Sequence, residues 1–189
     1  MAGIDPDGLD AVIFWGQNQY GHGGANPSFF LNAAKVAAYD YEESHYKCSL
    51  SVDDRGSLNF SESQPSAHIV KATNIQDMIS ALSMYTNIDT IEYFGHAGSP
   101  ALYLSHNQAL TASQVNSLPT TNVLPNATIR LVGCDTAGSM PPGKPSIAQA
   151  FANHFHTNVN GYKGGLSFFG PYPRTFIFGD ATPTSVSPN

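Results

Sequence analysis

Two side chains near the middle of this 189-residue chain have the types and the setting that thiol chemistry requires. His96 follows an apolar run over 88–94, and Cys134 follows a second apolar run over 127–132. A thiol must become a thiolate before it attacks a carbonyl group, and a nearby imidazole can take its proton. The two residues therefore suggest a nucleophile and its base.

Small residues flank both candidates. Gly133 precedes the cysteine, while Gly95, Ala97 and Gly98 surround the histidine. Acyl transfer also needs backbone N–H groups that face the developing oxyanion, and glycines let a substrate approach them. These two segments meet that need. Asp135, directly after the cysteine, is a candidate for lining the cleft, for orienting the nucleophile or for capping the turn.

The apolar runs that precede the two candidates predict the elements that position them. Runs rich in Ile, Val, Thr, Tyr and Phe and closed by glycine are typical of buried strands that end in turns. In an open α/β sheet, catalytic groups collect beyond the carboxyl ends of the strands. The 38 positions from His96 to Cys134 leave room for a hairpin and a helical crossover between parallel neighbours. We therefore expect both side chains at one edge of the sheet.

The rest of the chain alternates between strand and helix patterns. Further strands are predicted over 10–15, 48–52, 57–61, 68–72, 101–104, 157–162, 166–169 and 175–178. Helices are predicted from Pro27 after an Asn26 cap, from an Asn74 cap with Met84 on the apolar face, from Thr111 to Leu118, and after a Ser146 cap. We expect a polar connector over 119–126 and a loosely held tail from Asp180. This order predicts one α/β domain over 10–189, with a mostly parallel central sheet flanked by helices.

Composition disfavours several classes of function. The chain has 8 basic and 14 acidic residues, a formal charge of −6, whereas nucleic-acid and anionic-membrane binders are normally basic. No apolar run approaches the roughly 20 residues that span a bilayer, and the polar amino end predicts no signal peptide. Nucleotide-loop and metal-site motifs are missing, so we expect no cofactor and no metal.

Alternative interpretations remain for each reactive residue. Cys134 could be a buried core residue, as free cysteines often are, and a bridge to Cys48 would occupy its thiol. Cys48 itself favours a structural role. His22, in a glycine-rich loop, could line the substrate cleft, hold a phosphate or only add flexibility. Three acidic residues are candidates for binding a basic substrate side chain: Asp53, Asp54 and Asp180.

The segments 93–98 and 131–134, with the helix that starts near Ser146, resemble the caspase-like cysteine peptidases. The closest likeness is to the autoprocessing protease domains of large bacterial toxins. The resemblance implies a caspase-like three-layer sandwich in which Cys134 is the nucleophile and His96 the general base and acid. Backbone N–H groups of Cys134 and of Ala97 or Gly98 would then bind the oxyanion. Ala97 stands where the family usually has glycine, and the caspase Gln-Ala-Cys-x-Gly signature is missing.

The amino end carries a second resemblance. Residues 4–9 read Ile-Asp-Pro-Asp-Gly-Leu and are similar to the boundary motif of Rhs-type polymorphic toxins, so 1–9 would be a remnant of the shell protein. This resemblance implies an antibacterial or anti-host effector. The Rhs shell and a secretion machinery such as type VI would deliver it into the target-cell cytoplasm, and a cognate immunity protein would protect the producer.

The leading hypothesis is therefore a cysteine endopeptidase that cleaves proteins in the recipient cell. A Cys–His pair alone does not name the bond that is cleaved, so a deamidase or a transglutaminase is the first alternative. A caspase-like interaction module that has lost turnover is the second. A nuclease is disfavoured by the acidic charge and by the lack of metal motifs.

Overall fold

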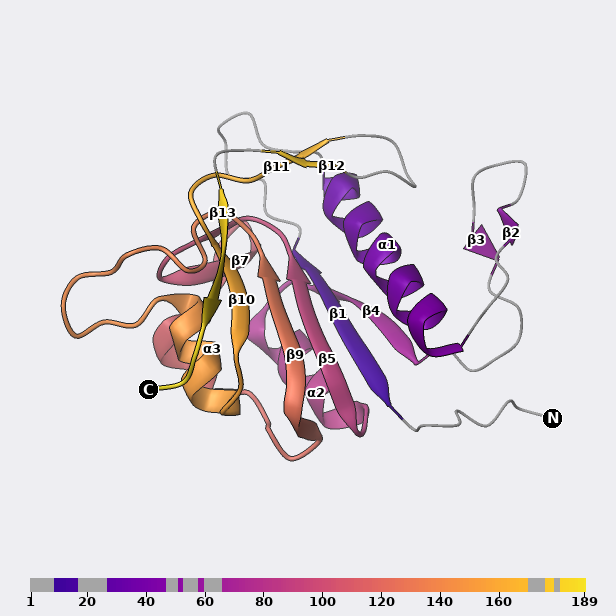
Figure 1. The fold of residues 1–189 in the computed structure, drawn as a ribbon, viewed down its shortest axis with the longest axis horizontal. Coiled ribbons are helices and arrows are strands. Elements are labelled where there is room, and N and C mark those ends of the chain that lie inside the picture. The colour runs from indigo at the N-terminus through magenta and orange to yellow at the C-terminus, as the bar shows by residue number, and fades with distance from the viewer. Residues whose placement is uncertain are drawn as a thin grey trace.

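A computed structural model of the chain describes residues 9–16, 27–46, 51–52, 58–59, 66–169, 176–178 and 181–189. Its centre is a six-stranded sheet with the order β13-β10-β9-β5-β1-β4 (Figure 1). These strands are β1 (Asp10–Gly16), β4 (Ala67–Ala72), β5 (Ile88–Phe94), β9 (Val123–Val132), β10 (Val159–Lys163) and β13 (Thr182–Val186). All neighbours run parallel except β13, which is antiparallel to β10. The predicted α/β class with a mostly parallel central sheet is confirmed.

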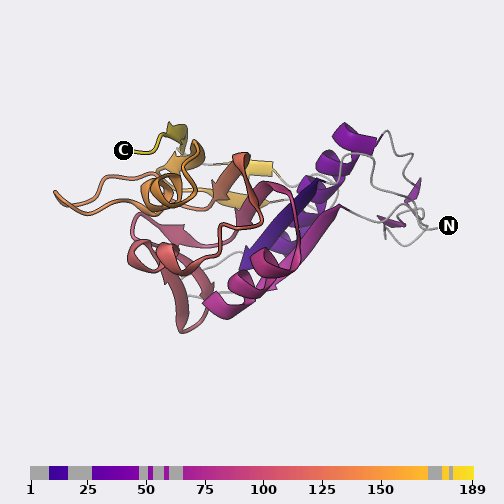
Figure 2. The ribbon, with the colours of Figure 1, turned by 90° about the horizontal axis from the view of Figure 1, so that it is seen from below.

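Helices cover both sides of the sheet and make three layers (Figure 2). On one side α1 (Pro27–Tyr46) packs on β1, β4 and β5. The other side carries α2 (Ile75–Met84), α3 (Ile147–Phe155) and the 3₁₀ helix η1 (Ala112–Ser117). Because side chains alternate along a strand, β1 sends Ala11 and Ile13 into the α1 core and Val12 and Phe14 into the other.

Among the described residues, three small sheets lie outside the central sheet, one of three strands and two of two strands. A hairpin of β6 (Ala97–Gly98), β7 (Ala101–Ser105) and β8 (Gln108–Thr111) follows β5. The short strands β2 (Ser51–Val52) and β3 (Leu58–Asn59) pair with each other, as do β11 (Ser167–Phe169) and β12 (Phe176–Phe178). The sequence predicts strands over 166–169 and 175–178, and the antiparallel pairing of β11 with β12 confirms both.

Capping residues begin two of the helices where the sequence predicts. The Asn74 side chain accepts hydrogen bonds from the backbone N–H groups of Gln76 and Asp77, and Asp77 accepts one back from the Asn74 N–H. Such a capping box satisfies N–H groups that have no partner within the helix. Ser146 caps α3 through Gln149. Both helices therefore start as their sequences indicate.

The structure corrects three expectations about the elements. Met84 is 70% exposed and does not belong to the apolar face of α2. The connector before β9 is shorter than predicted, because Val123 already pairs with Ile88 of β5. The tail is not loosely held, since 182–186 forms β13 and pairs with β10; Pro183 is tolerated because β13 is an edge strand. Asn26 lies outside the described residues.

Tyr93 ties the end of β5 to its surroundings. Its side chain is completely buried, and its hydroxyl donates to the Tyr103 carbonyl at 2.6 Å and lies 3.1 Å from the His96 carbonyl. Burial raises the pKa of the phenol far above its ordinary value, so the group stays a protonated donor. Tyr93 thereby anchors both the β7 hairpin and the turn that follows β5.

We expect Tyr93→Phe to lower the free energy of unfolding by about 1–3 kcal/mol, because it removes a buried hydroxyl that donates to the Tyr103 carbonyl. Urea denaturation followed by circular dichroism measures the change. The control is Tyr85→Phe, which removes a hydroxyl from a partly exposed ring stacked on His68 and should change stability by less than about 0.5 kcal/mol. Equal effects of the two variants would contradict the anchoring role of Tyr93.

A candidate thiol site at the carboxyl ends of β5 and β9

The register of β5 and β9 brings the two reactive residues to the same level. The strands are parallel neighbours, paired from Thr90 with Thr128 to Phe94 with Val132. His96 lies two residues beyond Phe94, and Cys134 lies two residues beyond Val132. Each candidate therefore lies the same number of residues beyond the last paired residue of its strand. The expected arrangement, parallel neighbours whose following turns share one sheet edge, is confirmed.

An ion pair between the same two strands helps to fix this register. Glu92 and Arg130 are register partners, and the Arg130 guanidinium donates to the Glu92 carboxylate at 2.6 Å. Burial raises the pKa of Glu92, and the Arg130 charge opposes that shift. Opposite charges at paired positions favour one alignment of the strands over a shifted one.

The turns that follow β5 and β9 are in direct contact. The Gly95 N–H donates to the Val132 carbonyl at 3.2 Å. A Cβ atom at Gly133 would lie 2.6 Å from the Cβ of Ala97 and 2.8 Å from the Gly95 carbonyl oxygen. Only glycine fits at 133 without displacing the neighbouring turn. Gly133 is therefore a packing requirement between the two turns.

Cys134 is half-buried and is not in a disulfide, and its sulfur contacts the backbone of a single residue. Its Sγ atom lies 3.3 Å from the Leu166 carbonyl oxygen and accepts from the Leu166 N–H at 3.2 Å. Within the described part of the chain, the N–H of Cys134 has no hydrogen-bond partner. The turn therefore offers one unpaired backbone donor next to a thiol whose sulfur is already oriented.

His96 lies on the α1 side of the sheet, against Phe30 of α1. The two rings meet edge to face with centroids 5.0 Å apart. Its Nε2 atom is buried and has no hydrogen-bond partner among the described residues. Burial lowers the pKa of the imidazole below its ordinary value, because the charged form is poorly solvated there. The ring is therefore held in the neutral form, which can accept a proton.

The two candidates are neighbours, but their side chains are not hydrogen-bonded to each other. The hydrogen bonds of the Cys134 sulfur are those to Leu166, which belongs to the α1-side cluster together with Phe30. Both side chains thus lie on the same side of the sheet. Bonds between catalytic groups are often long or absent without substrate.

Asp135 adopts a left-handed backbone conformation, with φ of 54°, and locks the cysteine turn in place. Its carboxylate accepts from the Ser99 hydroxyl at 2.6 Å and from the Gly164 N–H at 3.2 Å. Its own N–H donates to the Gly164 carbonyl at 2.8 Å. Because Ser99 lies in the turn between β6 and β7, Asp135 fastens the cysteine turn to the hairpin that follows His96. The structure assigns this residue a positioning contact rather than an open place in a cleft.

Several candidates of the sequence analysis are placed elsewhere or are not described. Ala97 and Gly98 form β6 and pair with Leu102 and Ala101 of β7. The following candidates lie outside the described residues: His22, Cys48, Asp53, Asp54 and Asp180. Across the described ranges, no three His, Cys, Asp or Glu side chains gather as a metal site, and no helix is long and apolar enough to cross a membrane.

Three residues that help to build the site were not predicted as site residues from the sequence. Leu166 contacts the thiol through its backbone, Ser99 bonds Asp135 through a hydroxyl, and Tyr93 anchors the His96 turn. A backbone contact between positions 32 residues apart leaves no trace in residue types. Ser99 and Tyr93 lie within or next to the motif around His96, which was the only sequence feature that pointed to them.

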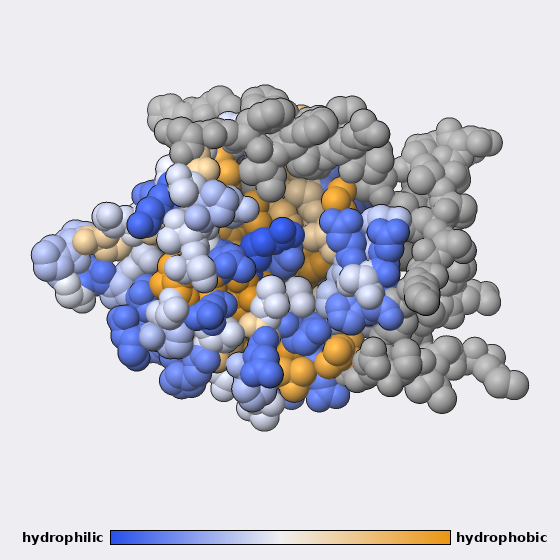
Figure 3. Space-filling model, in the orientation of Figure 1, coloured by the Kyte–Doolittle hydropathy of each residue, from blue (hydrophilic) through white to orange (hydrophobic). Residues whose placement is uncertain are grey.

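The α1 side of the sheet is only partly covered. While α1 packs on β1, β4 and β5, the outward residues Thr128 of β9, Asn160 of β10 and Ser185 of β13 are exposed. Figure 3 shows apolar atoms in the middle of this side, surrounded by hydrophilic ones. An extended surface therefore lies below the Cys134 turn on the side to which the thiol belongs.

A serine–histidine–aspartate group occurs near the opposite end of the strands, where β5 begins. Ser44 Oγ lies 2.9 Å from His45 Nδ1, and His45 Nε2 lies 3.7 Å from the Asp89 carboxylate. However, the Ser44 hydroxyl donates to the Tyr41 carbonyl at 2.7 Å, and Nδ1 lies 2.9 Å from the same oxygen. Both side chains therefore bond back to a backbone carbonyl within α1, as serine in a helix often does. With the hydroxyl donated to that carbonyl, the group is not a nucleophile with its base.

Compared with family models, with curated proteins and with solved structures, the chain matches none of them.

The contact between the turns predicts that Gly133→Ala destabilises the protein by about 1–3 kcal/mol through overpacking. Gly98→Ala is the matched control, because a Cβ there would meet its nearest neighbours at 3.4 and 3.7 Å, which is ordinary contact. Urea denaturation of both variants measures the difference. A Gly133→Ala protein as stable as the control would show that the turns can separate without cost.

The buried imidazole predicts an acid-sensitive contribution to stability. Because the pKa of His96 is lowered in the folded state, the unfolded chain binds its proton more readily as the pH falls below about 6.5. Stability is then present above that pH and is lost as the pH falls through the folded-state value. We expect the urea midpoint to fall less in His96→Gln than in the wild type between about pH 7.5 and about pH 5. Equal losses would contradict a neutral, buried His96.

Proposed function

We propose that this chain is a cysteine endopeptidase in which Cys134 is the nucleophile and His96 the general base and acid. The proposal rests on one observation: the two residues follow paired strands at equivalent positions, in turns that contact each other. The thiol is not in a disulfide, and the imidazole is neutral and has no hydrogen-bond partner among the described residues. A nucleophile and a proton acceptor at one sheet edge are the minimum that acyl transfer requires. The same arrangement supports the likeness to caspase-like peptidases.

The reaction would begin with transfer of the Cys134 proton to the Nε2 atom of His96. The thiolate then attacks the carbonyl carbon of a peptide bond, and the carbonyl oxygen becomes an oxyanion. His96 returns the proton to the leaving amine as the C–N bond breaks and a thioester remains. Water, deprotonated by His96, hydrolyses the thioester and restores the thiol. No oxidant, metal or further co-reactant is needed.

The unpaired N–H of Cys134 is the best oxyanion donor that the described residues offer. The N–H of Asp135 is already bound to Gly164, and Ala97 and Gly98 belong to the β6–β7 ladder. A backbone donor next to the nucleophile is positioned before substrate arrives and costs no reorganisation during the reaction. The Asp135 contacts to Ser99 and Gly164 keep this part of the turn rigid.

The uncovered strands on the α1 side suit a polypeptide substrate. Outward residues of β9, β10 and β13 are exposed there, while α1 borders the other half of the sheet. A chain lying across this surface could reach Cys134 without moving a helix. The biological setting proposed from the amino-end motif is an Rhs-type effector that cleaves proteins in the target-cell cytoplasm and is blocked by a cognate immunity protein.

One observation favours a second candidate, a binding module without turnover. The Cys134 sulfur is hydrogen-bonded to Leu166 and not to the imidazole. A protein without turnover could have the same arrangement. A deamidase or transglutaminase would share the thioester step and differ only in the bond that is attacked. Measurements on the thiol and on the products separate these possibilities.

Alkylation of the folded protein by iodoacetamide tests the pair directly. We expect Cys134 to react faster than Cys48 at about neutral pH, and His96→Ala to slow its alkylation by about tenfold or more. His106→Ala, in the exposed turn between β7 and β8, is the control and should leave the rate unchanged. If His96→Ala does not change the rate, His96 is not the base and the proposed mechanism fails.

The products identify the reaction. Incubation of the wild-type protein with a bacterial lysate, followed by mass spectrometry of newly formed protein amino termini, should reveal cleavage sites that Cys134→Ala does not produce. If glutamine side chains are modified and the protein chains keep their full length, the activity is that of a deamidase or a transglutaminase and not of a peptidase. Absence of both changes, with a folded protein and a reactive thiol, would favour the binding module.

A further inference from the structure

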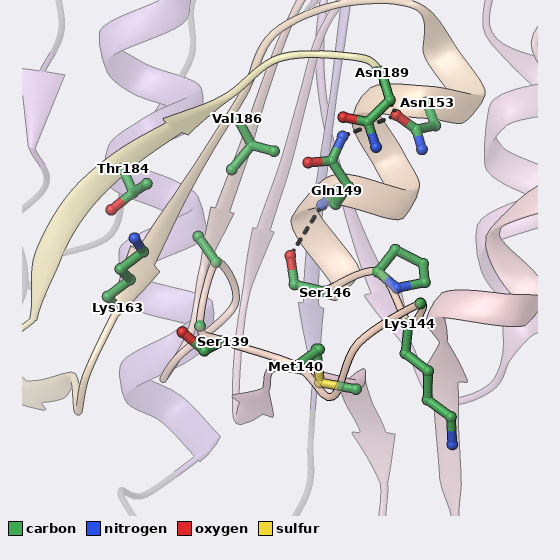
Figure 4. Close-up of a pocket in the computed structure, with 14 residues that line it drawn as sticks. Ser139, Met140, Lys144, Ser146, Gln149, Asn153, Lys163, Thr184, Val186 and Asn189 are labelled. Atoms are coloured by element: carbon green, nitrogen blue, oxygen red, sulfur yellow. Dashed lines mark hydrogen bonds between the residues drawn. The ribbon is translucent and has the colours of Figure 1, made fainter.

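A groove of about 690 Å³ lies on the α3 side of the sheet, away from the thiol. Its walls are α3, the ends of β10 and β13, and the loop over 138–145 (Figure 4). Ala137, which also lines it, packs in the core of the α3 side, whereas Cys134 contacts Leu166 on the α1 side. The groove is therefore a separate site from the proposed peptidase centre. Its volume is in the range of ligand-binding pockets.

The charge of this groove is opposite to that of the chain. Lys144 and Lys163 line it, and none of the described side chains that line it is acidic, although the last residue, Asn189, also lies there. Neither lysine forms an ion pair within the described ranges. By contrast, Arg130 is paired with Glu92, and Lys71 lies over the Trp15 ring. A protein with a net charge of −6 thus keeps two cations uncompensated in one groove.

The placement of the donors does not suit a compact phosphate. The two lysines stand on opposite sides of the groove in Figure 4 and do not converge on one point. The first N–H groups of α3 are already used, with Ile147 donating to the Ser99 carbonyl and Ala148 to the Thr136 carbonyl. A phosphate site at a helix start relies on such free N–H groups. A ligand must instead reach from one lysine to the other.

The neutral part of the lining mixes amides, hydroxyls and apolar side chains. Gln149, Asn153 and Thr184 supply polar groups, while Met140 and Val186 supply apolar contact. Gln149 already donates to the Ser187 carbonyl and to Asn153, so it holds the β13 end against α3. An extended peptide presents alternating polar and apolar groups of this kind, with side chains that can carry charge at both ends.

We propose that the groove binds an extended, acidic polypeptide segment of a protein partner, with carboxylates that meet Lys144 and Lys163. Charge complementarity selects the ligand, because the overall −6 charge repels an acidic chain while the two uncompensated cations of this groove attract it. This interaction does not depend on the proposed peptidase activity. It concerns the opposite side of the sheet and holds for an active or an inactive Cys134.

Titration of the ¹⁵N-labelled full chain with a hexaglutamate peptide tests the proposal. We expect backbone shifts to concentrate around Lys144, Lys163 and α3, and the affinity to weaken with added salt. Lys144→Glu combined with Lys163→Glu should raise the Kd by about tenfold or more. Lys35→Glu, an exposed reversal on α1, should change it much less. Both lysines are exposed, so the double variant should fold, and circular dichroism checks this.

Three outcomes would overturn the proposal. The first is no binding of hexaglutamate, or binding that the double reversal and the Lys35 control weaken equally. The second is shifts confined to residues outside the groove. The third is tighter binding of pyrophosphate than of the peptide at the same residues, which would make the groove a small-anion site. Because every readout is binding, loss of peptidase activity in Cys134→Ala has no bearing on the result.

Discussion

The contact between the turns that follow β5 and β9 is the constraint on which the rest of the site depends. No Cβ atom fits at Gly133, because Ala97 and the Gly95 carbonyl already occupy that space. This approach requires the two strands to be parallel neighbours in one register, which the Glu92–Arg130 pair supports. Turns packed this closely move together, since interiors at native density leave no room for independent shifts. The relative position of His96 and Cys134 is thus set by backbone packing.

The chemistry of the site then depends on small adjustments within that rigid frame. The Cys134 sulfur is held by the backbone of Leu166, while the imidazole of His96 is neutral and lacks a hydrogen-bond partner among the described residues. An unpaired buried nitrogen costs free energy, and such groups are uncommon in folded proteins. A ligand or a rotated thiol that supplies the missing partner would recover that free energy.

The segment after Cys134 links the two sides of the sheet. Asp135 bonds Ser99 and Gly164 near the thiol, Thr136 accepts from the N–H of Tyr162 in β10, and the chain then forms the wall of the lysine-lined groove. One short stretch thereby contributes to both proposed sites. The α1 side offers a nucleophile and exposed strands, and the α3 side offers uncompensated positive charge. Their different chemistry suits two different polypeptide contacts.

The sequence by itself determined the strands of the central sheet other than β13, the helices that flank it, the capping residues Asn74 and Ser146, and His96 and Cys134 as the reactive candidates. These follow from local patterns, in which apolar periodicity and turn residues are read over a few positions. Only the tertiary structure decided the contact of Leu166 with the thiol, the Ser99–Asp135 bond, the pairing of β13 and the groove that joins Lys144 with Lys163. These contacts join residues far apart in the chain, several of them through backbone atoms that are alike in every residue. No residue pattern encodes them.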